Sequence, residues 1–159
     1  MAKITIEGMS TFSKQLEKWV AEAHKINRGA LGEAAGFVAQ QFGQAIDSIP
    51  VRDDSTHPHR LYGATASELA QIKDNFGIST FRETSGGTNT SIGFTGYVNT
   101  PSKRFNDNVP TGMLVQCINY GTSFRVGTHT LDRVTSASRS EIERIIQEYI
   151  EEKTSNIFK

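Results

Sequence analysis

The feature that most constrains the fold is a continuous apolar stripe at three- and four-residue spacing between residues 31 and 49. This spacing places its members on one face of an α-helix, and Pro50 ends the pattern. The stripe consists of Leu31, Ala34, Ala35, Val38, Phe42, Ala45, Ile46 and Ile49. A helix with one apolar face must bury that face, so the rest of the chain has to supply a surface that covers it.

A second amphipathic pattern precedes this helix and follows Ser10, a suitable N-cap residue. Its apolar residues again fall three or four apart: Phe12, Leu16, Trp19, Val20 and Ala23. The intervening Asn27-Arg28-Gly29 is typical of a break between helices. We therefore expect two consecutive helices within the first 50 residues.

Small residues crowd the second predicted helix, and Phe37 lies off its main apolar stripe. The small residues would let a neighbouring backbone approach closely. A Phe outside the stripe indicates either a wide core face or a contact between subunits, and the sequence leaves both interpretations open.

A short helix and a hairpin are expected after residue 63. Thr65 followed by Glu68 is a capping-box pattern, which predicts a helix that ends near Gly77. The period then changes to two, and residues 78–82 and 90–98 on either side of a glycine pair predict a β-hairpin.

The remaining elements complete a mixed fold. Residues 3–7 alternate and predict a short strand, whereas 113–118 fit either a strand or a short helix. An apolar stripe over 131–149 predicts a terminal helix. We expect one α+β domain over residues 1–159, in which a small antiparallel sheet packs against a long N-terminal helical segment and the C-terminal helix.

Two polar stretches without periodicity, about 50–63 and 99–112, are expected to be long exposed loops. Loops of this length in a small domain are usually binding elements or become ordered on binding. They are therefore the first places to look for contacts with partners.

Composition excludes several classes of function. The 17 basic and 17 acidic residues balance, so bulk charge does not indicate a nucleic acid or an anionic membrane as partner. The single cysteine, Cys117, excludes an internal disulfide and a cysteine-based zinc site. No apolar run approaches the roughly 20 residues that span a bilayer, so we expect neither a membrane segment nor a secretion signal.

Three groups of residues could carry chemistry, and a structural interpretation is preferred for each. The loop over 53–59 holds carboxylates and imidazoles that could bind a divalent cation, but its spacing fits no metal motif. His129 and Asp132 could serve a nucleophile, although they stand where groups collect at the start of a helix. Lys103-Arg104-Phe105 could touch a phosphate backbone or simply form an exposed loop. We expect no catalytic residue, no metal and no cofactor.

The order of short motifs along the chain resembles a known family. Gly8-Met9-Ser10 leads into the first helix, Ile49-Pro50-Val51 ends the second, and Ile118-Asn119-Tyr120-Gly121-Thr122-Ser123 precedes the last. With the hairpin between them, this order is similar to the phage minor tail and head-to-tail joining family, which includes tail-completion proteins. An inserted loop after Pro50, and Asn119 at a position that is usually acidic, depart from the family pattern.

The resemblance implies a structural virion protein, made in the host cytoplasm and placed in the neck or head-proximal tail of a long-tailed phage. It implies a ring of identical copies, expected to be hexameric, that contacts the connector or stopper and the tail tube or tail terminator. DNA would touch it only by passing through the ring, and no membrane is involved.

Other functions stay open beside tail completion. The chain could be a tail terminator that caps the tail tube, a small metal-dependent hydrolase using the 53–59 loop, or a DNA-binding module using Lys103 and Arg104. The residues expected to contact partners are Phe37, Arg52, Asp53, Asp54, His57, His59, Lys103, Arg104, Phe105, Tyr120 and Thr122.

Overall fold

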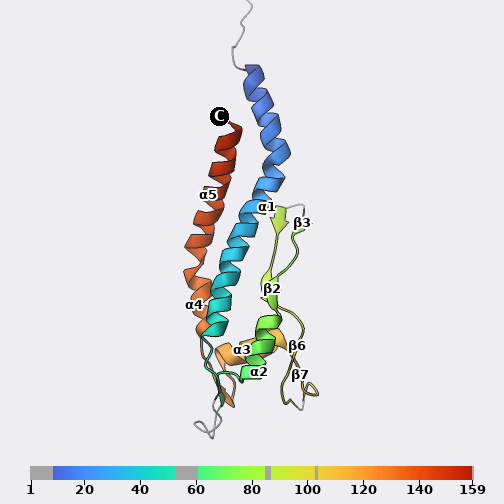
Figure 1. Ribbon diagram of the computed structural model, residues 1–159, viewed down its shortest axis with the longest axis vertical. Helices are drawn as coiled ribbons and strands as arrows, with labels where there is room; N and C mark the ends of the chain where they lie inside the picture. The colour runs from blue at the N-terminus through green and yellow to red at the C-terminus, as the bar shows by residue number, and fades with distance from the viewer. Residues whose placement is uncertain (1–8, 53–60, 85–86, 103, 159) are drawn as a thin grey trace, which may run out of the picture.

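The computed structural model describes residues 9–52, 61–84, 87–102 and 104–158, and it has an α+β fold. The molecule is elongated (Figure 1). Two long helices, α1 (Met9–Asp47) and α5 (Arg139–Ile157), run antiparallel along its length, and the shorter elements gather at one end. We call this end the base. The predicted strand over 3–7 lies outside the described residues.

The N-terminal segment is one helix rather than two, so the break predicted at Asn27-Arg28-Gly29 is wrong. Gly29 is needed for packing, because a Cβ atom at this position would lie 2.2 Å from the hydroxyl oxygen of Tyr149 on α5. Ile26 and Ala30 on either side are buried. Burial of this face against the rest of the fold offsets the roughly 1 kcal/mol by which glycine weakens a helix interior.

The C-terminal helical segment is in turn divided, into α4 (Thr130–Ala137) and α5, which meet at the buried Ser138. The partly buried side chains of α5 include the predicted Ile142, Ile145, Ile146 and Tyr149. The amphipathic stripe was therefore predicted, but the bend within it was not.

Two short helices form the base. In α2 (Ala66–Asp74) the predicted capping box is confirmed, since Thr65 and Glu68 exchange hydrogen bonds of 2.8 and 3.1 Å. The segment that fitted either a strand or a helix forms α3 (Thr111–Tyr120). The largest fully buried side chains are Ile46, Ile72, Ile118, Val98 and Thr111, so the core lies where the end of α1 meets these helices.

Four two-stranded ladders replace a single sheet in the described residues. The predicted hairpin is confirmed up to Phe94: β2 (Phe76–Ile78) pairs with β5 (Ile92–Phe94), and β3 (Arg82–Thr84) pairs with β4 (Gly87–Asn89), all antiparallel. Residues 97–98, predicted as the end of its second strand, belong to a different ladder. A parallel pair joins β1 (Leu61–Tyr62) to β8 (Arg125–Val126).

The expectation of an exposed loop over the whole of 99–112 is wrong. In this region β6 (Tyr97–Asn99) pairs with β7 (Asn108–Pro110), and the chain then enters α3. Val109 and Thr111 are buried, which anchors the segment on the core and leaves only the tip of a hairpin outside. The ends of the 50–63 loop are also ordered by backbone hydrogen bonds. The Arg52 amide donates to the Ala64 carbonyl, and the Ala64 amide donates to the Pro50 carbonyl.

Candidate partner-binding surfaces

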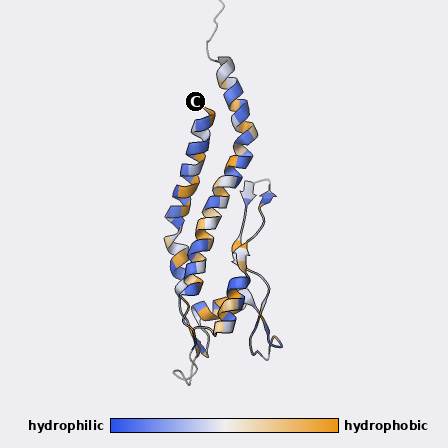
Figure 2. Cartoon of the chain, in the orientation of Figure 1, coloured by the Kyte–Doolittle hydropathy of each residue, from blue (hydrophilic) through white to orange (hydrophobic). Residues whose placement is uncertain are grey.

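The first candidate surface is the N-terminal part of α1, residues 11–22, which we call the arm. The arm extends past the C-terminal end of α5 (Figure 1), and hydrophobic positions continue along it (Figure 2). Its apolar residues continue a stripe with alternating spacings of four and three: Phe12, Leu16, Trp19, Ala23, Ile26 and Ala30. That spacing is the heptad pattern by which one helix packs along another.

Exposure changes sharply along this stripe. Ile26 and Ala30 are 8% and 1% exposed where α1 runs beside α5, whereas Leu16 and Phe12 are 44% and 54% exposed. Val20, next to the stripe, is 63% exposed. The same helix face is therefore buried within the chain at one end and open to solvent at the other.

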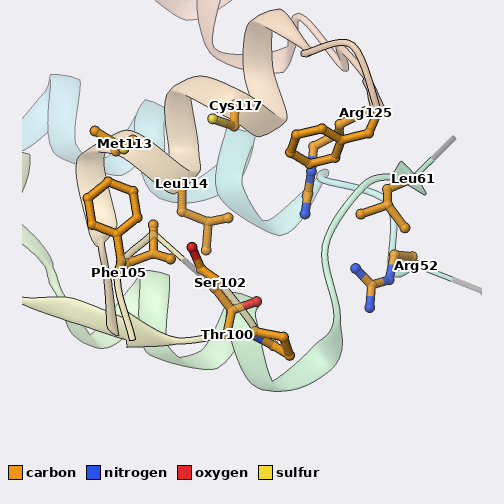
Figure 3. A pocket seen from close by; sticks show the side chains of 12 residues that line it. Arg52, Leu61, Thr100, Ser102, Phe105, Met113, Leu114, Cys117 and Arg125 are labelled. Carbon is orange, nitrogen blue, oxygen red and sulfur yellow. The ribbon is translucent and has the colours of Figure 1, made fainter. Parts of the chain in front are cut away.

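The second candidate surface is a pocket of about 470 Å³ at the base (Figure 3). One side is apolar and is formed by Phe105, Val109, Met113, Leu114 and Cys117. These residues come from the β6–β7 hairpin and from α3, so the pocket depends on the segment that was expected to be a loop.

The opposite side of the pocket carries two arginines. Figure 3 shows the guanidinium groups of Arg52 and Arg125 across from the ring of Phe105. Arg125 is 4% exposed and donates from Nη1 to the Gly63 carbonyl at 2.5 Å. Its Nε is also buried and has no hydrogen-bond partner among the described residues.

A buried carboxylate, Glu68, faces both arginines. It accepts hydrogen bonds from the Thr65 amide at 2.8 Å and from the Thr100 hydroxyl at 2.5 Å. Burial alone would raise the pKa of Glu68, but these bonds and the charges of Arg125 and Arg52 hold it below its usual value. Burial lowers the pKa of Arg125; Glu68 opposes this change and Arg52 adds to it.

The predicted contact residues are only partly brought together. Arg52 and Phe105 line the pocket, and the Arg104 guanidinium lies over the Phe105 ring at 5.3 Å from its centroid. Phe37 is half-buried on α1, away from this group. Five further predicted contact residues lie outside the described residues: Asp53, Asp54, His57, His59 and Lys103.

Tyr120 and Thr122 belong to a structural junction between α3 and α4. The Asn119 side chain donates to Asp132 at 2.8 Å and accepts from the Leu131 amide at 3.0 Å, which ties the two helices together. Gly121 has a φ of 82°, and a Cβ atom there would lie 2.8 Å from backbone atoms of the following turn. The aromatic-Gly-Thr motif is therefore explained by this turn, with the Tyr120 ring 63% exposed beside it.

His129 is part of the same junction, as the helix-entry interpretation expected. It is the N-cap residue of α4 and its Nδ1 lies 3.1 Å from Asp132. The hydrogen bonds from His129 and Asn119 lower the pKa of Asp132, while a hydrogen bond to Asp132 raises the pKa of Tyr120. Over the described ranges, no group of three or more His, Cys, Asp or Glu residues could hold a metal ion.

Sequence reasoning missed Arg125 and the arm. A single arginine between Phe124 and Val126 was a usable signal, since a charged residue in an apolar segment that becomes buried needs a partner. The arm was recognised as an amphipathic helix, but the exposure of its apolar residues Phe12 and Leu16 in the described part of the chain depends on where α5 ends.

In the part of the chain that the structure describes, no helix is long and apolar enough to cross a bilayer. Comparison with known proteins finds no matching family model, no matching curated protein and no matching solved structure.

Proposed function

We propose that this chain is a structural assembly protein in the neck of a long-tailed bacteriophage, where it acts in tail completion or head-to-tail joining as part of a ring. The order of sequence motifs supports the phage assignment. The observation that carries the assembly role is the apolar stripe of α1, which continues uncovered beyond α5 along the arm.

The arm offers enough apolar surface to drive association. Burying a large apolar side chain contributes about 1.5–3 kcal/mol, and Phe12, Leu16 and Val20 are all about half exposed or more. Together they could supply roughly 3–5 kcal/mol on association, before the entropy of binding is subtracted.

The neighbour on the arm is a helix of another copy. The positions beside the heptad stripe within the arm are Ser13, Gln15, Val20 and Glu22, so Glu22 is the one charged residue at the edge of a contact between identical chains. In a ring each copy uses one surface to bind a different surface of the next, and a projecting arm suits such a contact.

The shape of the molecule fits a joining role. The α1–α5 pair holds the arm at one end and the pocket at the other (Figure 1). Two separate surfaces at opposite ends allow one chain to contact its own copies and a different component of the particle at once.

Electron microscopy of particles made with altered arms tests the proposal. Phe12→Glu with Leu16→Glu would place charges in the helix contact, and we expect separate filled heads and free tails. Lys14→Glu adds a carboxylate to the same arm outside the stripe and should leave particles intact. Intact particles from the double variant, or from phage lacking the protein altogether, would refute the joining role. Tails of irregular length would indicate a tail terminator instead.

A further inference from the structure

We infer that residues 3–7 of a second copy of this chain pair with the outer edge of β2 and add a third strand to the β2–β5 ladder. We call these residues the N-terminal segment. The inference rests on the proposed assembly into rings and goes beyond it, because it names a contact between copies that the arm does not make. Three features support it: an open strand edge, a matching alternation of side chains, and the length of α1.

The backbone of β2 presents hydrogen-bonding groups on the side away from β5. The Ser79 amide donates to the Ser91 carbonyl at 2.7 Å, just beyond the end of the ladder. Residues of an antiparallel pair turn their backbone groups to the partner strand in alternation, so Phe76 and Ile78 turn theirs to the outer edge. Among the described residues, β2 pairs with no strand other than β5.

Of the two edges of this ladder, that of β2 is the more open. All three residues of β5 are half-buried, and this strand contacts α3. On β2, by contrast, Gly77 is exposed and Ile78 is 43% exposed. Residues 76–81 contain no charged residue and no proline, which commonly protect an exposed edge from pairing. The β2 edge is therefore suited to a further strand.

The alternation of the N-terminal segment matches the two faces of the ladder. The Phe76 ring packs on α1, and Ile78 lies on the same face because side chains alternate along a strand. In the N-terminal segment, Ile4 and Ile6 alternate with polar residues. A strand at the β2 edge would place both isoleucines beside Phe76 and Ile78 and would cover the exposed part of Ile78. Its polar residues would continue the opposite, polar face.

The N-terminal segment cannot reach β2 of its own chain. Phe76 on β2 lies beside Phe42 of α1, with 6.2 Å between the ring centroids. Met9 lies about 50 Å from Phe42, since an α-helix rises by about 1.5 Å per residue. A fully extended chain spans at most about 3.6 Å per residue, so Lys3 lies no more than about 22 Å from Met9. The strand that pairs with β2 must therefore come from another copy.

Spin labelling across copies tests the inference with the full chain. A nitroxide is attached at Thr5→Cys in a chain that also carries Cys117→Ser, which removes the natural cysteine. This chain is mixed with isotope-labelled wild-type protein, so that NMR detects only the broadening caused by a different copy. We expect the amide signals of Phe76 and Ile78 to lose intensity and to recover when the nitroxide is reduced with ascorbate. Unchanged intensities, whether the protein associates or stays monomeric, would overturn the inference.

Two double variants of the N-terminal segment separate strand pairing from general attraction. Ile4→Ser with Ile6→Ser removes its apolar face and should weaken self-association about tenfold, measured by sedimentation. Lys3→Ser with Glu7→Ser makes the same number of changes on the polar face and should alter association by less than about twofold. Equal effects of the two variants would contradict the match between the segment and the ladder.

A proline at the edge tests the backbone contact. Ile78→Pro removes an N–H group that faces away from β5, so the ladder can keep its own bonds, and it should weaken self-association about tenfold. Ile78→Val retains the N–H group and should associate like the wild type. Circular dichroism shows whether each variant folds. A folded Ile78→Pro that associates like the wild type would refute the inference, and if this variant fails to fold, the N-terminal variants decide the question.

These results are distinguishable from those of the arm variants. A mixture without broadening refutes the strand contact and leaves the result with the arm variants standing. Intact particles from the arm variants refute the joining role, whereas broadening across copies would still support the strand contact. Broadening seen only when nitroxide and isotope label are in the same chain would mean that the chain's own segment lies at this edge, and the second copy would be excluded.

Discussion

The arm and the base both present apolar surface, but they obtain it in opposite ways. The arm is a single stretch of α1, and Phe12 and Leu16 are exposed because no other helix among the described residues lies against them. The base surrounds its pocket with side chains from α3, the β6–β7 hairpin and the segments on either side of residues 53–60. Binding at the arm should therefore be separable from folding, whereas binding at the base should not.

The largest expected effect is in the core of the base. Ile118 on α3 is fully buried, and Ile118→Ala should lower the free energy of unfolding by about 2–5 kcal/mol through lost burial and a cavity. Urea denaturation followed by circular dichroism measures the change. A loss below about 1 kcal/mol would mean that the base is not the stable centre of the fold.

The next effect concerns the buried charges beside the pocket. Glu68→Gln should lower the free energy of unfolding by about 1.5–3 kcal/mol at neutral pH, because it removes a charged acceptor that faces two arginines.

The pH dependence of this effect has a definite sign. The pKa of Glu68 in the folded chain lies below its ordinary value of 4.5, so its contribution is present above that pH and disappears as the pH falls through the folded pKa. Denaturation curves from pH 7 to pH 3 should show less loss of stability for Glu68→Gln than for the wild type. Parallel profiles would argue that the carboxylate is not stabilised by its neighbours.

A pair of glycine variants compares the junction at the base with the long helix. Gly121→Ala should destabilise the protein by about 1–3 kcal/mol, since φ is 82° and the new Cβ would meet backbone 2.8 Å away. Gly36→Ala on α1 meets no atom within 4 Å and should stabilise by about 0.5–1 kcal/mol. Thermal unfolding of both variants checks the contrast, and equal shifts would refute it.

The smallest effect on stability is expected in the arm. Phe12→Ala with Leu16→Ala should change the free energy of unfolding by no more than about 0.5 kcal/mol, because both side chains are largely exposed. The same variant should weaken self-association, measured by sedimentation at increasing protein concentration. A large loss of stability in the monomer would show that the arm is part of the folded core.

The elements with strong local signals could be predicted. The Thr65–Glu68 capping box depends on residues three apart, and the hairpin around residues 85–86 depends on alternation and a glycine turn, so neighbouring residues determine both. The α+β class followed from these elements.

The errors occurred where distant residues decide. The local sequence predicts a helix break at Asn27-Arg28-Gly29. The helix continues instead, because Tyr149 on α5 packs against Gly29. The segment over 99–112 is polar enough for a loop, yet two of its own residues, Val109 and Thr111, are buried, and β7 forms. Burial against distant elements can exceed the small local preferences that a sequence pattern expresses.

The sequence by itself determined the amphipathic stripe of α1, the residues that cap α2 and the lack of an obvious catalytic motif. Only the tertiary structure decided which part of that stripe is covered, because coverage depends on where α5 ends. It also brought together Arg52, Glu68 and Arg125, since charges far apart in the chain come close enough to interact only in the folded structure.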